Sequence, residues 1–224
     1  MQRKALLIMD NKEVFSTLNE IRNLMERSSK ILSLSGMSAV FIGIYACLAA
    51  VIAYYIVGGD ASFGRYFPTI PSLTINPHNQ LNWMIGLALC LIFLCIATAF
   101  FFAYRKAMHN NQRFVFDRTA RRLLWSFFVP MITGGILCIA LIRQQQFDLI
   151  SPIMLIFYGI ALINLSNYTY SNTRFLGYAE ILLGLTNCFV AAYSLLCWTI
   201  GFGVFHIIYG FFFYLKYDKK KNVR

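Results

Sequence analysis

Residues Leu81–Tyr104 read LNWMIGLALCLIFLCIATAFFFAY and contain no charged side chain. A helix needs roughly 20 apolar residues to cross the hydrocarbon core of a bilayer, which is about 30 Å thick. Five further stretches satisfy or approach this requirement: Ile31–Val57, Leu123–Ile142, Leu149–Leu165, Phe175–Ala191 and Leu195–Leu215. The sequence therefore predicts an all-α integral membrane protein built as a six-helix bundle.

The composition excludes a water-soluble domain. Of the 224 residues, 58% are hydrophobic and only 13% are charged, whereas soluble domains carry roughly a quarter charged residues. The net charge of +11 does not indicate a nucleic-acid partner, because the Lys and Arg residues flank apolar runs instead of clustering on a soluble fold. Anionic lipid at the inner membrane face is the partner that this charge favours.

The positions of Lys and Arg predict how the chain crosses the membrane. If the N-terminus is cytoplasmic, all but two of the 20 Lys and Arg residues lie on the cytoplasmic side, and the exceptions are Arg65 and Arg143. Basic residues close to a membrane tend to stay in the cytoplasm. We therefore expect a multi-pass protein of the cytoplasmic membrane with its N-terminus and C-terminus in the cytoplasm.

Three segments are expected along the chain. Residues 31–217 form the transmembrane domain, and its mostly short connections predict three antiparallel hairpins. Residues 1–30 form a cytoplasmic amphipathic helix, which lies in the inner interface, packs under the bundle or dimerises as a heptad seam. Residues 218–224 form a basic cytoplasmic tail. The amphipathic helix is predicted from apolar residues at helical spacing: Val14, Leu18, Ile21 and Met25.

Two local patterns refine this architecture. The outer connection Gly58–Gln80 contains three prolines, Pro68, Pro71 and Pro77, which predict that no helix forms there. Tyr-Gly dipeptides at similar places in the fourth and sixth spans hint at a repeated hairpin, although one dipeptide does not establish a repeat: Tyr158-Gly159 and Tyr209-Gly210.

Glu180 is the only acidic residue inside a predicted span. An ionisable group in a membrane helix is costly and usually faces the bundle interior with a partner. Glu180 shares one helix face with small and polar residues, which predicts a contact with another helix: Gly177, Gly184, Asn187 and Ala191. Such a residue is more often a neutral or hydrogen-bonded link between helices than a site for a proton or a cation.

His206 lies in the last predicted span between Gly203 and Gly210, which leave one side of the helix open to a neighbour. Tyr193, in the turn between the last two spans, lies midway between Glu180 and His206 in the sequence. The two residues therefore have equal depth in adjacent antiparallel helices, although depth does not fix the rotation of either helix. We predict an intramembrane polar pair, with supporting polar residues nearby: Glu180 and His206, supported by Asn187 and Asn164.

The sequence contains no motif for catalysis or for a bound cofactor. It has three histidines, of which His78 and His109 fall in loops on opposite sides of the membrane. The six cysteines lie within or beside apolar runs without a CxxC pair, which is typical of packing residues. No GxSG serine motif, HExxH pair or phosphate-binding loop occurs. We therefore expect a protein that is not an enzyme and holds no metal or cofactor.

Two stretches, Arg174–Leu185 (RFLGYAEILLGL) and Trp198–Gly210 (WTIGFGVFHIIYG), resemble a family of small bacterial six-helix membrane proteins without an assigned activity. The resemblance implies a bacterial cytoplasmic membrane and supplies no catalytic residues. We expect a non-enzymatic accessory, sensing or assembly component, whose partner is another membrane protein or a second copy of itself. The alternative is a small transporter or channel that uses Glu180 and His206 for a proton or a cation.

Overall fold

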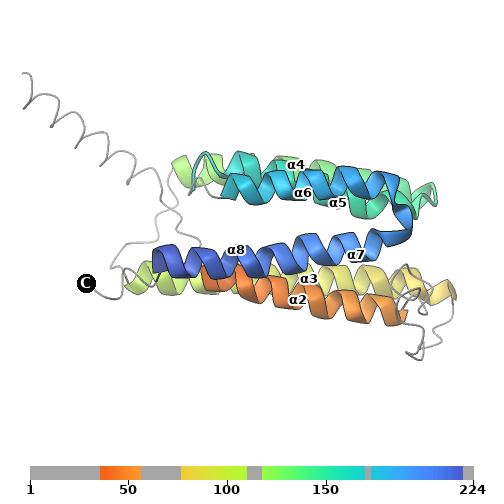
Figure 1. Ribbon diagram of the computed structural model, residues 1–224, viewed down its shortest axis with the longest axis horizontal. Helices are drawn as coiled ribbons and strands as arrows, with labels where there is room; N and C mark the ends of the chain where they lie inside the picture. Colours follow the sequence, from red (N-terminus) through yellow and green to blue (C-terminus); the bar gives the residue numbers. More distant parts are fainter. Residues whose placement is uncertain (1–35, 57–76, 110–117, 170–172, 219–224) are drawn as a thin grey trace, which may run out of the picture.

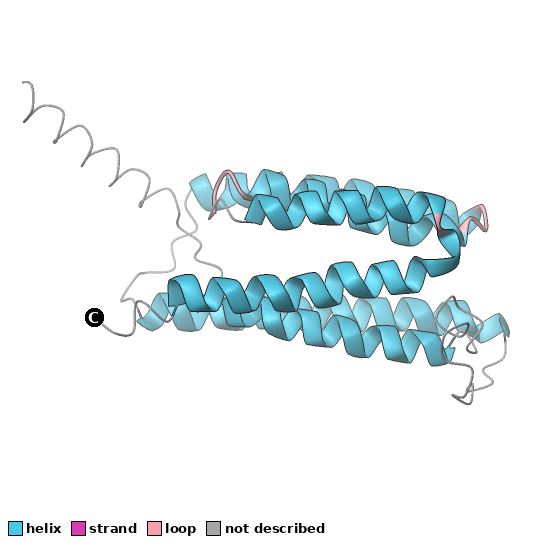
Figure 2. Cartoon of the chain, in the orientation of Figure 1, coloured by secondary structure: helices cyan, strands magenta, loops and turns pink. Residues whose placement is uncertain are grey.

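The computed structural model describes residues 36–56, 77–109, 118–169 and 173–218, and these residues are helical apart from short turns (Figure 2). No strand occurs within these ranges, so the prediction of an all-α chain is confirmed for them. The predicted amphipathic helix at 1–30 lies outside the described residues. So do most of the outer connection and all of the basic tail after Asp218.

Five helices come first along the described chain: α2 (Gly36–Ile56), α3 (Pro77–His109), α4 (Arg118–Arg143), α5 (Ile150–Leu165) and α6 (Thr173–Phe189). The last membrane-length segment is continuous but changes its helical form. It consists of α7 (Ser194–Trp198), the π-helical η3 (Thr199–Phe205), α8 (His206–Phe213) and the π-helical η4 (Tyr214–Asp218). Two short 3₁₀ turns, η1 (Phe147–Leu149) and η2 (Ala191–Tyr193), precede α5 and α7.

Five helical segments are long and apolar enough to cross a membrane: Gly36–Ile56, Asn79–Arg105, Ala120–Arg143, Phe147–Leu165 and Ser194–Lys216. They coincide with five of the six predicted spans. The sixth, α6, has 17 residues, which is at the short end of what crosses a bilayer. The helices are compatible with a multi-pass membrane protein.

The beginning of α3 differs from the prediction. Pro77 was expected to belong to a connection without helix, yet α3 begins at Pro77. Proline is tolerated in the first turn of a helix, because its missing N–H would have no partner within the helix there. The proline therefore marks where the helix begins.

The helices form two groups, each with a central helix (Figure 1). In one group α5 packs against α4 on one side and α6 on the other. In the second group α2 packs against α3 and against the segment formed by η3 and α8. The chain passes from the first group to the second at η2 (Figure 1). The segments at the two ends of the described chain, α2 and α8, therefore lie side by side.

Glycine contacts of the same kind close the central helix pair in both groups. In the α5/α6 pair, a Cβ atom added to Gly159 would lie 2.6 Å from the carbonyl oxygen of Gly177. In the α2/α8 pair, a Cβ atom added to Gly210 would lie 2.6 Å from the carbonyl oxygen of Gly36. Backbones that approach this closely are typical of small residues at contacts between membrane helices.

The two outer helices, α3 and α4, each pack against the rest of the molecule on one side only. None of the membrane-length part of α3 is buried and only 11% of that of α4 is, against 44% for α2. Their exposed side chains are large and apolar, for example Phe93 and Ile96 on α3 and Ile136 on α4. The interior of the molecule therefore lies along α2, α5, α6 and the α7–α8 segment.

Candidate functional site between the two helix groups

Glu180 lies on the face of α6 that turns into the molecule. The residues of α6 that are buried include Gly177, Glu180, Gly184 and Asn187, which agrees with the face predicted from their spacing. The side chain of Glu180 is fully buried. Neither of its carboxyl oxygens has a hydrogen-bond partner among the described residues. Of the two predicted forms of a link between helices, hydrogen-bonded or neutral, the contacts of Glu180 do not match the hydrogen-bonded one, and the neutral one stays a prediction.

His206 is the first residue of α8, and both of its ring nitrogens make hydrogen bonds. Nδ1 lies 3.1 Å from the carbonyl oxygen of Gly201, and Nε2 lies 2.6 Å from the hydroxyl of Tyr158. A carbonyl oxygen can only accept, so Nδ1 carries the hydrogen. A neutral imidazole then leaves Nε2 as the acceptor of the Tyr158 O–H.

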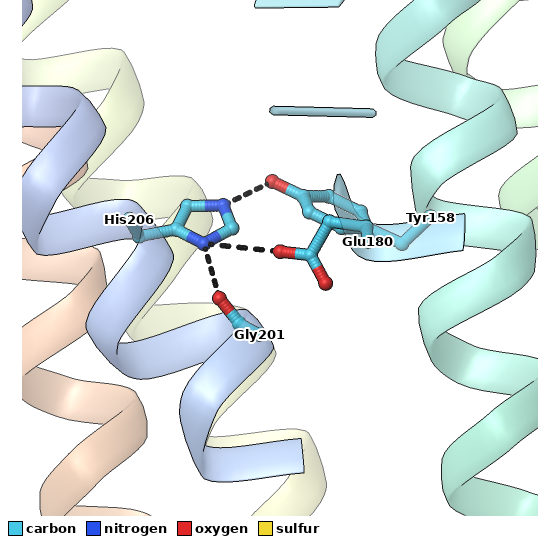
Figure 3. Close-up of polar contacts among 4 residues, drawn as sticks. All are labelled: Tyr158, Glu180, Gly201 and His206. Carbon is cyan, nitrogen blue, oxygen red and sulfur yellow. Dashed lines mark hydrogen bonds and ion pairs between the residues drawn. The ribbon is translucent and has the colours of Figure 1, made fainter. Parts of the chain in front are cut away.

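Glu180 and His206 face each other across the junction of the two helix groups (Figure 3). Oε1 of Glu180 lies 3.7 Å from Nδ1 of His206, which is longer than a hydrogen bond between these atoms. Tyr158 of α5 approaches the same imidazole ring from the side of α6 (Figure 3). Three helices therefore bring a carboxyl, an imidazole and a phenol together, and the structure places the predicted pair within one site.

The π-helical segment Thr199–Phe205 supplies the backbone part of the site. A π-helix pairs residues five apart, and the Nδ1 of His206 meets the carbonyl of Gly201 at that same separation. Gly201 also makes room for the carboxyl group: a Cβ atom there would lie 2.5 Å from Oε2 of Glu180 and would overlap Leu155. Short π-helical stretches inside α-helices are frequent at functional sites.

Aromatic rings pack around the imidazole of His206. The rings of Trp198 and Phe202 are 5.1 Å apart, and those of Phe202 and His206 are 6.3 Å apart. Tyr158 packs against both Phe202, at 5.0 Å, and His206, at 5.3 Å. These rings limit how far the imidazole can turn, which fixes the direction of its two nitrogens.

Other hydrogen bonds hold the junction at its two ends. Near the α6–α7 connection, Asn187 donates from Nδ2 to Oγ of Ser151 at 2.8 Å, and Ser151 donates to the carbonyl of Ser194 at 2.9 Å. At the other end, the hydroxyls of Thr173 and Tyr209 are 2.9 Å apart. Asn187 therefore supports the junction but does so about two turns from Glu180 on α6.

Asn164 does not join the site. It lies near the end of α5, where its backbone carbonyl accepts a hydrogen bond from the N–H of Asn167 at 3.3 Å. It follows Tyr158 by six positions, which is about 9 Å along a helix. Its side chain makes no hydrogen bond with the rest of the described chain, so its support of the polar pair is a prediction that this arrangement does not favour.

Sequence reasoning missed three contributors to the site: Tyr158, Gly201 and Ser151. Tyr158 did carry a signal, because a tyrosine at mid-span must find a partner for its hydroxyl. Ser151 carried a weaker one, since hydroxyls in membrane helices often bond across helices. Nothing in the sequence around Gly201 distinguishes a π-helical turn from an α-helical one.

The described residues bring a carboxyl, an imidazole and a phenol together at this site. Within the described ranges, no group of three or more His, Cys, Asp or Glu side chains is placed to hold a metal ion. All six cysteines are unpaired thiols. No family model, curated protein or solved structure matches the chain.

Proposed function

We propose that this chain is a six-helix integral protein of the bacterial cytoplasmic membrane that acts as a non-enzymatic accessory, sensing or assembly component. In this proposal α6 also spans the membrane, so that the six spans form three antiparallel hairpins with both termini in the cytoplasm. The observation that carries the proposal is the complete burial of Glu180. Leu155, Gly201 and His206 fill the space around its carboxyl group.

The occupied space around the carboxyl group of Glu180 distinguishes the accessory, sensing or assembly role from that of a transporter or channel. A transporter or channel needs a water-accessible path to its charged group, whereas a protein that acts through helix packing has that face occupied by neighbouring helices. Three sets of hydrogen bonds connect the two helix groups in addition to the packing. The junction between the groups therefore has the character of a structural contact.

The charge distribution supports the orientation and a lipid partner. Exposed basic residues lie at the end of the molecule where α3 and the α8 segment finish and α4 and α6 begin: Arg105, Arg121, Arg122, Arg174 and Lys216. Anionic headgroups on the cytoplasmic leaflet attract such residues. The apolar outer surfaces of α3 and α4 then face lipid, another membrane protein or a second copy of this chain.

Purification in a mild detergent, followed by mass spectrometry of the proteins that remain bound, tests the proposal. We expect either one partner in a fixed ratio or a defined oligomer of this chain. The same preparation in liposomes should carry no proton or cation flux. A monodisperse monomer that conducts, and that stops conducting when Glu180 is replaced by Gln, would contradict the proposal.

The second candidate is a small transporter or channel that uses Glu180 and His206 for a proton or a cation. The observation that favours it is the absence of hydrogen-bond partners for both carboxyl oxygens among the described residues. A pH-sensitive dye inside liposomes, with an imposed proton gradient, distinguishes this candidate. Flux that is lost on Glu180→Gln and retained on Asp148→Asn, which alters an exposed carboxyl, would establish it.

A further inference from the structure

His206 lies between two acceptors that compete for one hydrogen. The Nδ1–H group bonds to the carbonyl of Gly201 at 3.1 Å, on its own helical segment. The carboxyl of Glu180, on α6, lies 3.7 Å from the same nitrogen. One acceptor keeps the bond within the α7–α8 segment, and the other would place it across the junction between the helix groups.

We propose that Glu180 and His206 form a proton-binding switch, in which the proton on Glu180 decides which of the two acceptors receives the Nδ1–H of His206. With the proton bound, Glu180 is neutral and the Nδ1–H stays with Gly201. When the proton leaves for the solvent, the resulting carboxylate takes the Nδ1–H and the bond to Gly201 is released.

The surroundings of Glu180 suit a proton better than a larger cation. Hard cations such as Ca²⁺ and Mg²⁺ take six or more oxygen ligands, or complete their shells with water. Among the described residues, the other oxygens that bond to this imidazole are the Gly201 carbonyl and the Tyr158 hydroxyl, and Leu155 packs beside the carboxyl group at Gly201. A proton needs one acceptor atom and no additional volume. The site is therefore already large enough for this ligand.

The exchange between acceptors needs only a small movement. A hydrogen bond from N–H to a carboxylate is about 2.8 Å long and roughly twice as strong as one to a neutral carbonyl. Closing the present 3.7 Å gap therefore takes about 1 Å of movement by the two side chains. Most of this movement falls to the carboxyl group of Glu180, because the Tyr158 hydroxyl and the aromatic rings hold the imidazole in place.

The ionisable groups of α5 and α2 that lie against this pair are a phenol and a thiol. Tyr158 from α5 faces the pair directly, with its hydroxyl 2.6 Å from Nε2 of His206. From α2, Cys47 lies against Gly203 in the π-helical segment. Phenols and thiols are neutral near pH 7. The charge that changes in the site is therefore that of Glu180 or His206.

The switch rests on the proposed function, because it assumes that the junction lies within the membrane. It gives the sensing role of that function a ligand, the proton. Loss of the Gly201 bond would free a carbonyl in the π-helical segment, and the new bond would tie α8 to α6. Proton binding would then change how firmly the two helix groups are held together. A partner contacting both groups would detect that change.

Infrared difference spectroscopy of the full chain in lipid nanodiscs tests the proton site. The wild type should show the C=O band of a protonated carboxylic acid at low pH, and the band should disappear as the pH is raised. Each of the nine Asp and Glu side chains contributes to this band at low pH. Glu180→Gln should therefore remove one component of it, whereas Asp148→Asn, at an exposed site, should keep that component. A Glu180 component that is absent at every pH, or that persists at every pH, would overturn the proposal.

Two further measurements test the acceptor exchange. His206→Gln leaves the carboxylate without its imidazole donor, so the pH at which the band is lost should rise by about one unit, the equivalent of one charge-assisted hydrogen bond. The chain has three histidines, so ¹⁵N-histidine labelling gives a simple spectrum in which His206→Gln identifies the His206 signals. The Nδ1 signal should shift at the same pH as the infrared band, and a signal that is independent of pH would contradict the exchange.

These outcomes are separable from failure of the proposed function. Membranes washed with alkaline carbonate retain an integral protein, so release of the chain would refute the membrane placement regardless of the spectra. Retention of the chain without the titrating band would leave the membrane proposal intact and refute the switch.

Discussion

At the scale of single residues, Tyr158 connects the acidic site to the rest of the fold. It is half-buried on α5, bonds to His206 on α8, and packs on Phe202 in the π-helical segment. Removing its hydroxyl therefore tests whether the junction depends on hydrogen bonding or only on packing.

We predict that Tyr158→Phe lowers the free energy of unfolding by about 1 kcal/mol, because the ring remains while Nε2 of His206 loses its donor. Unfolding in detergent micelles, followed by circular dichroism, measures the change. Tyr178→Phe on α6 is the matched control, since Tyr178 is 53% exposed and its substitution should alter the stability little. Equal stability of the two variants would show that the bond to His206 contributes nothing measurable.

The sequence predicts that Glu180 and His206 lie at equal depth, because depth along a helix depends only on the number of residues from the turn. Tyr193 lies midway between Glu180 and His206, and a turn there places the two at one level in any antiparallel pair of helices. The rotation of α8 is a different matter, because it depends on the π-helical turn at Thr199–Phe205. A shift of one residue in that turn rotates His206 by about 100° about the helix axis, and the sequence does not show where such a shift occurs.

At the scale of helices, the close contact of α5 and α6 depends on glycine. A Cβ atom on Gly159 would meet the carbonyl oxygen of Gly177 at 2.6 Å and the backbone nitrogen of Ile181 at 3.0 Å. Backbone atoms cannot move aside as the end of a flexible side chain can. The helices would have to separate.

Gly159→Ala should therefore destabilise the fold by about 2 kcal/mol, within the range seen for overpacked interiors. Gly135→Ala on α4 provides the comparison, because a Cβ atom there meets nothing within 4 Å. Alanine should even stabilise α4 by up to about 1 kcal/mol through its higher helix propensity. Thermal unfolding of both variants in one lipid or detergent gives the difference, and a tolerated Gly159→Ala would mean that the pair can separate without cost.

Helix positions were the most predictable feature at this scale. Apolar length fixes them, and the predicted span Leu123–Ile142 lies within α4 while Leu149–Leu165 nearly equals α5. The start of α3 at Pro77 was less predictable, because proline ends some helices and begins others. The choice depends on whether the following residues continue the helix, and the apolar run after Leu81 does so.

At the scale of the whole molecule, the pairing of helices was not predictable from the sequence. The Tyr158-Gly159 and Tyr209-Gly210 dipeptides suggested a repeated hairpin. In the structure Gly159 meets Gly177 on the next helix along the chain, whereas Gly210 meets Gly36 at the other end of the described chain. The close contact between glycines therefore occurs in both helix groups, but only in the α5/α6 pair does it join helices that follow each other in the sequence. Helical periodicity reveals which face makes a contact but contains no information on which helix receives it.

The last prediction concerns the orientation of the chain in the membrane. Single cysteines can be introduced once the six native cysteines are replaced by Ala or Ser, which their unpaired state permits. Cysteines at Ser62 and Asn79 should react with an impermeant thiol reagent in intact cells. Cysteines at Asn111 and Asn222 should react only after permeabilisation, because basic residues surround both positions and stay cytoplasmic.

The four positions also test the number of spans, and the cysteine-free chain serves as the blank. Asn79 lies in the first turn of α3 and is exposed, whereas the other three positions lie outside the described residues. Labelling of Asn111 inside and Asn222 inside requires an even number of crossings between them. If α4, α5 and the α7–α8 segment cross, α6, at 17 residues, must therefore cross with them. If Asn222 reacted in intact cells, one of these helices would fail to span the bilayer, and α6 would be the first to examine because the other three are long enough. Glu180 would then lie in a helix that does not cross the bilayer, and the membrane setting on which the proton switch depends would be removed.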